Sequence, residues 1–216
     1  AGNDFVSLQS IASGRTTATA YGSTDSSIDL GSGNDSLFIN ASASGSGGWW
    51  GGGKVAAYGA LNSDIQTGSG DDFIVINASA SNRGGWWRGG GYAEAVGLGN
   101  GSSINTGDGN DAIHITARAN GRTTNAWAMR DSNINTGSGD DSVTLNAFTN
   151  SRFIDPAYGA SNSSINLGSG NDSLLINASA NGRTWGSIAA YGALNTKINT
   201  SGQELQGLPP LDGFDV

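Results

Sequence analysis

The chain has 216 residues, of which 36 are glycine, 3 are proline and none is cysteine, and its 18 acidic and 10 basic residues give a formal net charge of -8. Scarce proline and the lack of a three-residue glycine period exclude a collagen triple helix, and the lack of cysteine excludes disulfide scaffolds and thiolate metal sites. So acidic a chain is poorly suited to nucleic acid, which requires basic surfaces, and no stretch approaches the length of a membrane-spanning helix.

A short string that contains glycine and aspartate recurs along the chain and defines a repeat. A truncated copy occupies residues 2–4, and a decayed copy lies at residues 201–204. The five complete copies are Gly31 to Asp35, Gly68 to Asp72, Gly107 to Asp111, Gly137 to Asp141 and Gly168 to Asp172. From Asp4 onward, the final aspartates are separated by 31, 37, 39, 30 and 31 residues. This spacing predicts one repeat domain over residues 1–205, with a unit of about 31 residues and inserts in two units.

Each string is followed by a segment in which aliphatic residues alternate with other types. After Asp35, for example, Leu37 and Ile39 lie two and four positions further on. A period of two predicts a strand with one buried face. A further aliphatic column lies seven residues before each final aspartate. Its members are Ile28, Ile65, Ile104, Ile134 and Ile165, and Ile198 takes the same place in the last unit.

A third segment in each unit carries an aromatic residue followed by glycine. These pairs are Tyr21-Gly22, Tyr58-Gly59, Tyr158-Gly159 and Tyr191-Gly192, and the middle units are aligned at Val96-Gly97 and Met129-Arg130. Each unit therefore holds about three short strands separated by glycine-rich corners. Aligned repeats of this size predict an all-β fold, a parallel β-solenoid of about six coils. Residues 206–216 form a non-repeating tail.

Stacked coils would place the acidic strings one above another, about 4.8 Å apart. An uncompensated column of carboxylates at that spacing would repel itself, and a bridging cation would relieve the repulsion. The string Gly31-Ser32-Gly33-Asn34-Asp35-Ser36-Leu37 resembles the calcium-binding nonapeptide G-G-x-G-x-D-x-U-x of the RTX (hemolysin-type) family, where U is a large aliphatic residue.

The resemblance implies that Ca²⁺ lies between the turns of successive coils. The implied carboxylate ligands are Asp35, Asp72, Asp111, Asp141 and Asp172, with Asp4, Asn34, Asp71, Asn110, Asp140 and Asn171 as weaker candidates. The implied carbonyl ligands are Gly33, Gly70, Gly109, Gly139 and Gly170. The chain departs from the family because the first glycine is replaced, by Leu30 or Thr67 for example, and because the period is longer than nine. The alternative is a turn in which Asn and Asp only cap their own backbone.

Two glycine-rich inserts, at residues 47–53 and 84–91, carry two tryptophans each, and we expect Trp127 and Trp185 at the equivalent corner of later coils. Exposed aromatic clusters commonly mark interaction sites. These rings could stack on sugars, pack against a neighbouring subunit or cover one face of the solenoid. The candidate interaction residues are Trp49, Trp50, Trp86, Trp87, Trp127 and Trp185.

Other polar residues suggest structural roles. Asparagines recur five residues after the aspartates, at Asn40 and Asn77 for example, and predict an amide ladder in preference to glycosylation. His114 falls on an outward strand position. A polysaccharide lyase or epimerase site would appear as one coil that breaks the pattern with clustered polar residues, and none stands out, so we expect no enzymatic activity.

Together these features predict a secreted, extracellular or cell-surface protein that binds calcium and has a structural role. Millimolar external calcium would fill sites too weak for the cytosol. Other copies of the chain are the expected partners, stacked head to tail or side by side in a filament or surface layer, unless the protein acts as an adhesin. The alternative function is a carbohydrate-binding module that holds cell-surface glycans through the tryptophan inserts.

Overall fold

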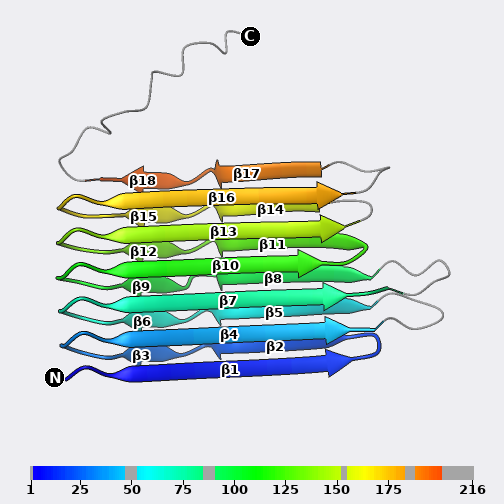
Figure 1. Cartoon of the computed structure of the whole chain (residues 1–216), viewed down its shortest axis with the longest axis horizontal. Coiled ribbons are helices and arrows are strands. Elements are labelled where there is room, and N and C mark those ends of the chain that lie inside the picture. The colour runs from blue at the N-terminus through cyan, green and yellow to red at the C-terminus, as the bar shows by residue number, and fades with distance from the viewer. Residues whose placement is uncertain (1, 47–52, 85–90, 152–154, 183–187, 201–216) are drawn as a thin grey trace, which may run out of the picture.

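The structure is a computed structural model that describes residues 2–46, 53–84, 91–151, 155–182 and 188–200, and these residues form a parallel β-solenoid (Figure 1). Each of its six coils contributes one strand to each of three parallel sheets. The predicted all-β solenoid of about six coils is therefore confirmed. Among the described residues, no helix has the length and apolar character that a membrane crossing requires.

The three sheets, here called A, B and C, take every third strand of the chain. Sheet A consists of β1 (Phe5–Gly14), β4 (Ser36–Gly45), β7 (Phe73–Asn82), β10 (Ala112–Asn120), β13 (Ser142–Ser151) and β16 (Ser173–Gly182). Sheet B consists of β2 (Ala18–Thr24), β5 (Lys54–Leu61), β8 (Tyr92–Gly99), β11 (Thr123–Arg130), β14 (Asp155–Ser161) and β17 (Ile188–Leu194). Sheet C consists of β3 (Ser27–Asp29), β6 (Asp64–Gln66), β9 (Ser103–Asn105), β12 (Asn133–Asn135), β15 (Ser164–Asn166) and β18 (Lys197–Asn199).

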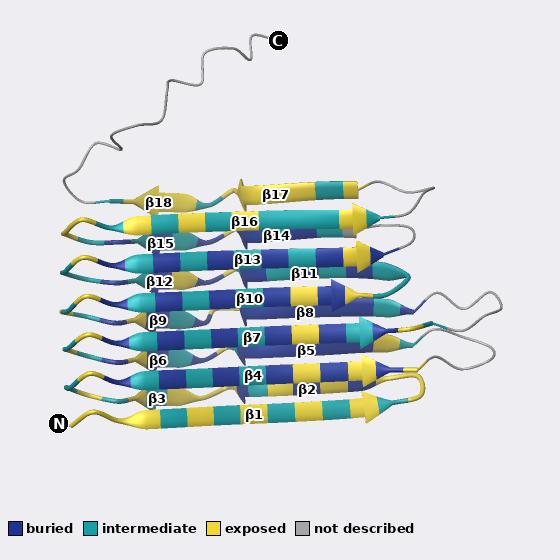
Figure 2. Cartoon of the chain, in the orientation of Figure 1, coloured by how far each residue is buried: buried dark blue, intermediate teal, exposed yellow. Residues whose placement is uncertain are grey.

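The core is a stack of similar layers, because like residues mostly pair with like residues in neighbouring coils. In sheet A, Leu37 pairs with Ile74 and Ile39 pairs with Ile76, and all four side chains are fully buried. The isoleucine column of sheet C closes the layer from the other side. Strand residues alternate between buried and more exposed positions, and the alternation continues from coil to coil (Figure 2).

Sheet B contributes small residues to the core, because the side chains of sheet A and the backbone of the next coil leave no room for larger ones. A Cβ at Gly59 would overlap the Cγ2 atom of Ile76 and the carbonyl oxygen of Gly97. Gly22 and Gly97 are crowded in the same way by Ile39 and Ile115. The core therefore pairs large aliphatic side chains with alanine and glycine, which explains how a glycine-rich chain can bury a continuous core.

The corner between sheets B and C is made by a column of Asn and Asp residues that the sequence analysis overlooked. Each adopts the left-handed conformation, with φ between 48° and 53°, and the members are Asp25, Asn62, Asn100, Asp131, Asn162 and Asn195. Asn and Asp tolerate this conformation better than other residues that carry a Cβ. The side chains also join coils, because Asn62 Nδ2 donates to Asp25 Oδ1 at 2.6 Å.

The predicted alignment of the fourth coil is wrong. Trp127, and not Met129, pairs with Val96 on one side and with Tyr158 on the other. The equivalent of the glycine column is therefore Ala128, and Met129 instead lies fully buried in the core beside Leu98. Trp127 thus belongs to strand β11, and it does not lie at the insert corner where we expected it.

Candidate functional site

The acidic turns lie where each coil passes from sheet C to sheet A, and they stack in register along the solenoid. Short parallel bridges connect Ser32, Ser69, Asp108, Ser138 and Ser169 in successive coils. The flanking glycines have positive φ angles, for example 98° at Gly68 and 123° at Gly70. A side chain on Gly70 would also overlap the carbonyl group of Gly33, so both backbone conformation and close stacking require glycine here.

The predicted ligand aspartates form an inner ladder inside this stack. The Oδ1 atom of each aspartate accepts a hydrogen bond from the backbone N–H of the aspartate one coil earlier. Asp72 Oδ1 accepts from Asp35 N at 2.8 Å, and Asp111 Oδ1 accepts from Asp72 N at 2.9 Å. Asp141 and Asp172 continue the ladder at 2.9 and 3.1 Å. The structure therefore brings the predicted carboxylates together in one column.

The residue before each of these aspartates forms an outer ladder of opposite polarity. Here the side chain accepts from the backbone N–H one coil later: Asn34 Oδ1 accepts from Asp71 N at 3.1 Å, and Asp71 Oδ1 accepts from Asn110 N at 2.8 Å. The bond from Asn171 N to Asp140 Oδ1, at 2.8 Å, repeats this geometry. The Asn and Asp side chains thus cap the backbone of a neighbouring coil, and not their own as the alternative reading supposed.

The inner carboxylates are buried, and half of each is left without a hydrogen bond. Asp35, Asp72, Asp111 and Asp141 are at most 2% exposed, and none of their Oδ2 atoms has a hydrogen-bond partner among the described residues. Burial raises the pKa of Asp111 to about 6, although the nearby Thr106 hydroxyl opposes the change. Burial likewise raises the pKa of Asp72 and Asp141. Each of these anions therefore requires a proton or a cation to be stable.

The fit of these residues to Ca²⁺ rests on those unpartnered oxygens. Calcium accepts carboxylate and carbonyl oxygens in flexible geometry. Within the described ranges, no three His, Cys, Asp or Glu side chains converge as a metal-binding group. A cation in the column would therefore depend on one or two carboxylates and on backbone carbonyls such as that of Gly33. Asp4 is exposed and Asp172 is half-buried, so the two ends of the column are less enclosed than its centre.

Trp127, the one candidate tryptophan within the described residues, packs against its neighbours along sheet B. Trp127 stacks on Tyr158 with ring centroids 5.5 Å apart and planes 6° apart, and Tyr158 stacks on Tyr191. The Arg130 guanidinium lies 4.7 Å from the centroid of Trp127. Because Tyr158 and Arg130 already pack against the Trp127 ring, this ring is not free to stack on a sugar. The other candidates lie outside the described residues: Trp49, Trp50, Trp86, Trp87 and Trp185.

One coil does break the pattern, on the outer face of sheet B, and the sequence analysis missed it. Glu94 on β8 is 7% exposed. Its carboxylate lies 3.0 Å from Lys54 Nζ and accepts hydrogen bonds from the hydroxyls of Tyr58 and Tyr92 at 2.9 and 3.0 Å. Arg130 approaches to 3.8 Å. We call these five residues the Glu94 cluster.

The Glu94 cluster is arranged to hold a charge in place. Burial alone would raise the pKa of Glu94, but the hydrogen bonds from Lys54 and Tyr58 bring that pKa below its ordinary value. Burial and the nearby carboxylate raise the pKa of Tyr92 to about 12, so its hydroxyl stays protonated near neutral pH. Both carboxylate oxygens are engaged. The cluster therefore links three coils, and the Glu94 carboxylate is not free to act as a base.

Two further predictions concern the outer face of sheet A. The amide ladder is present, since Asn77 Nδ2 donates to Asn40 Oδ1 and Asn177 Nδ2 to Asn146 Oδ1, both at 3.0 Å. His114 points outward as expected but is half-buried, with its ring edge-on to Phe73 at 5.6 Å.

Comparison of the chain with protein-family models, with curated proteins and with solved structures gives no match.

Proposed function

We propose that this chain is an extracellular calcium-binding β-solenoid with a structural role. The observation that supports the proposal is the inner column of buried carboxylates with unpartnered Oδ2 atoms. Leaving a buried anion uncompensated costs several kcal/mol. In the described part of the chain, the ion pairs of Lys54 and Arg130 go to Glu94 and Asp131, so none of them compensates the column.

Calcium would supply the missing positive charge without breaking the inner ladder. The residues that would hold it are Asp35, Asp72, Asp111 and Asp141, together with glycine carbonyls of the same turns. Occupancy at about 100 times the dissociation constant stabilises the folded state by about 2.7 kcal/mol for each site. Millimolar external calcium suits weak sites of this kind, which is the basis for proposing an extracellular or cell-surface location.

Assembly with other copies is the structural role that we propose. Among the described residues, the strands of the first and last coils have a hydrogen-bonded neighbour on one side only, and apolar side chains such as Phe5 and Ile198 are exposed there. A further coil in the same register would cover such an edge. The alternative role in glycan binding depends on the tryptophan inserts, which lie outside the described residues, and Trp127 does not favour it.

Calcium titration of the chelated protein tests the proposal. Isothermal calorimetry should show binding, and thermal unfolding followed by circular dichroism should shift upward with calcium and much less with magnesium, which demands a rigid octahedral site. The decisive variant changes all four buried aspartates to asparagine, which keeps the Oδ1 acceptor and removes the charge. We expect calcium binding to be lost.

The matched control is Asp71→Asn with Asp140→Asn, the same chemical change on the outer ladder, and it should bind calcium like the parent chain. Equal calcium binding by the parent chain and the four-aspartate variant would contradict the proposal. So would a parent chain whose stability does not respond to millimolar calcium.

A further inference from the structure

A shallow trough follows the outer face of sheet A at the end of the strands remote from the acidic turns. One hollow of about 540 Å³ is lined by residues of β1, β4 and β7, and a second of about 510 Å³ is lined by residues of β7, β10, β13 and β16. The two hollows share Ser81, so together they extend over all six coils. The residues along the trough pair in register, and they are Ser13, Ser44, Ser81, Asn120, Asn150 and Asn181.

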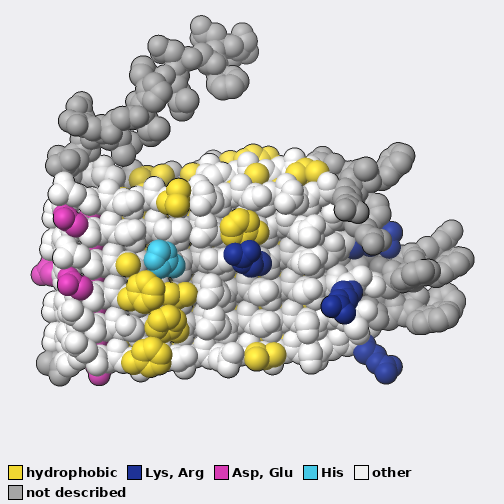
Figure 3. All heavy atoms as spheres, viewed as in Figure 1, with side chains coloured by type: hydrophobic (Ala, Val, Ile, Leu, Met, Phe, Trp, Pro, Cys, Tyr) yellow, Lys and Arg dark blue, Asp and Glu magenta, His cyan; other side chains and the backbone are white. Residues whose placement is uncertain are grey.

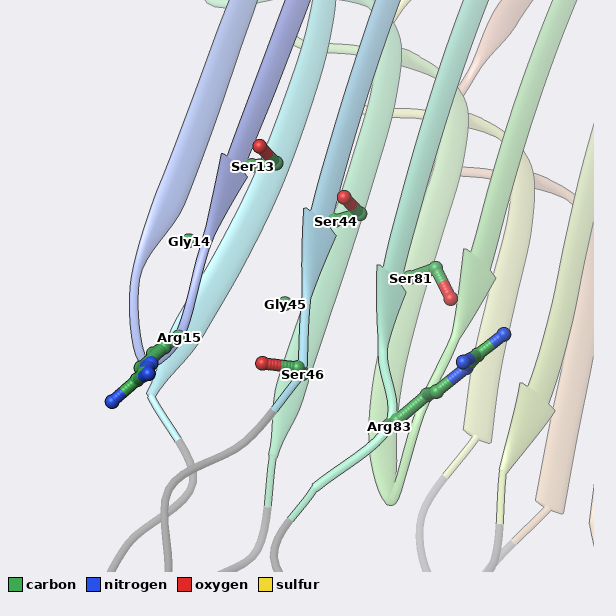
Figure 4. A pocket seen from close by; sticks show the side chains of 8 residues that line it. All are labelled: Ser13, Gly14, Arg15, Ser44, Gly45, Ser46, Ser81 and Arg83. Carbon is green, nitrogen blue, oxygen red and sulfur yellow. The ribbon is translucent and has the colours of Figure 1, made fainter.

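The trough is basic, although the whole chain is acidic. Arg15 and Arg83 reach outward on either side of the first hollow (Figure 4), and Arg118 lines the second. No acidic side chain is among the residues that line either hollow. Both Arg15 and Arg83 are exposed, and no ion pair within the described residues involves either of them.

The opposite edge of sheet A carries the complementary charge. Asp71, Asp108 and Asp140 are exposed on the acidic turns of three successive coils, and we call them the acidic ridge. Figure 3 shows acidic side chains gathered at one edge of this face and basic side chains towards the other. The ridge is distinct from the buried inner column, so a cation held by the inner column would leave the ridge carboxylates exposed.

Trough and ridge both run across the stacked coils, whose backbones are about 4.8 Å apart. The arginines of the trough come from the first, third and fourth coils, and the carboxylates of the ridge come from three successive turns, so the two surfaces are parallel and opposite in charge. They lie at opposite edges of one sheet, about 30 Å apart for strands of ten residues. A contact between unlike surfaces of this kind is heterologous, so it propagates from copy to copy in an open row or a closed ring.

From this geometry we propose that the acidic ridge of one copy packs into the basic trough of the next, so that copies associate side by side in a row. The proposal rests on the structural role above, but it does not depend on calcium in the inner column. Serine and glycine residues line much of the first hollow and leave room for the turns of the partner. Because the charges are exposed, the association weakens at high ionic strength, where the Debye length falls to about 3 Å at 1 M salt.

Two variants separate the two surfaces. The trough variant carries Arg15→Glu and Arg83→Glu. The ridge variant carries Asp71→Asn, Asp108→Ser and Asp140→Asn, and at each of these positions other coils already have the introduced residue, so the turns are preserved. Asp131→Asn, the same type of change at an exposed corner position where other coils already carry asparagine, is the control, and far-ultraviolet circular dichroism verifies that each variant keeps its strands.

Analytical ultracentrifugation in millimolar calcium then gives the decisive comparison. The parent chain and the control should self-associate, and each of the two variants should self-associate about 100-fold more weakly. A mixture of the two variants retains one intact ridge and one intact trough, so it should form 1:1 dimers and nothing larger.

A mixture that stays monomeric while the parent chain associates would overturn the proposal, and unchanged association of either variant would assign assembly to another surface. A parent chain that stays monomeric would overturn both this inference and the assembly role, while leaving calcium binding to its own test. Binding of polygalacturonate to the trough, without association of copies, would show that an acidic polysaccharide is the occupant instead.

Discussion

Two kinds of buried carboxylate coexist in this solenoid, and they differ in how their charge is balanced. The inner-ladder aspartates repeat in every coil, so Asp35, Asp72, Asp111 and Asp141 each lie between two other aspartates. Burial raises the pKa of Asp111, Asp72 and Asp141. Glu94 occurs in one coil only, and although burial would raise its pKa, Lys54 and Tyr58 of the preceding coil, together with Tyr92, bring that pKa below its ordinary value. Repetition multiplies an electrostatic cost, whereas a unique position can receive unlike partners from adjacent coils.

The largest expected effect is on the pH dependence of the chelated protein. A raised folded-state pKa contributes stability that is fully present below the unfolded value, 3.8, and is lost as the pH rises through about 6. For Asp111 alone the difference is about 3 kcal/mol, and Asp72 and Asp141 act in the same direction. Urea unfolding between pH about 4.5 and 7 should show decreasing stability in chelator and a flatter profile in calcium. Stability that rises with pH over this range in chelator would show that the inner aspartates, like Glu94, are already compensated.

The next effect concerns the Glu94 cluster. Glu94→Gln removes the charge that balances Lys54 and Arg130 and leaves one tyrosine hydroxyl facing an amide donor. We expect a loss of about 2 kcal/mol in the free energy of unfolding, measured with urea at neutral pH. Lys54→Gln is the control and should cost less than about 1 kcal/mol, since the Lys54 side chain is 53% exposed. An unchanged unfolding midpoint for Glu94→Gln would show that the cluster does not stabilise the fold.

The same carboxylate-to-amide change should raise the free energy of unfolding in the inner ladder, whereas Glu94→Gln lowers it. Asp111→Asn keeps the Oδ1 acceptor for Asp72 N and removes a buried charge. In chelator at pH about 7.5 we expect stabilisation by about 1 kcal/mol. In calcium the gain should disappear, because the variant would lose a ligand. Destabilisation of the chelated variant would mean that the Asp111 charge is already compensated in the folded chain.

The smallest effect is expected on the outer ladder. Asp71→Asn introduces the residue that Asn34 and Asn110 already provide one coil away, and it retains the acceptor for the backbone N–H of Asn110. The unfolding free energy should change by less than about 0.5 kcal/mol, with or without calcium. A larger change would show that the charge of Asp71, like that of the inner aspartates, affects the stability of the fold.

The repeated features could be predicted from the sequence because repetition itself is visible there. The aliphatic alternation and the isoleucine column predicted the coils and their register. The error at Trp127 came from following the aromatic-glycine pair. Counting from the isoleucines would have avoided it, since Tyr21, Tyr58 and Trp127 each precede an isoleucine by seven residues.

The Glu94 cluster could not be predicted in this way, because its members do not repeat. Lys54 and Arg130 are each about 40 residues from Glu94 along the chain, and only the coil register brings them together. The inward direction of the aspartates was also hidden, since it follows from the positive φ angles of the flanking glycines. The stacking of the carboxylates was therefore predicted, but their enclosure was not.

The opposite polarity of the two turn ladders gives the solenoid a direction of growth. The backbone N–H of Asp72 is satisfied by Asp111, which is synthesised later, whereas the N–H of Asp71 is satisfied by Asn34, which is synthesised earlier. A chain that emerges with its amino terminus first can therefore dock each new turn at once through the outer ladder. The N–H groups of Thr67, Gly70 and Asp72 all bond to the following coil, so the newest turn stays incomplete until its successor arrives.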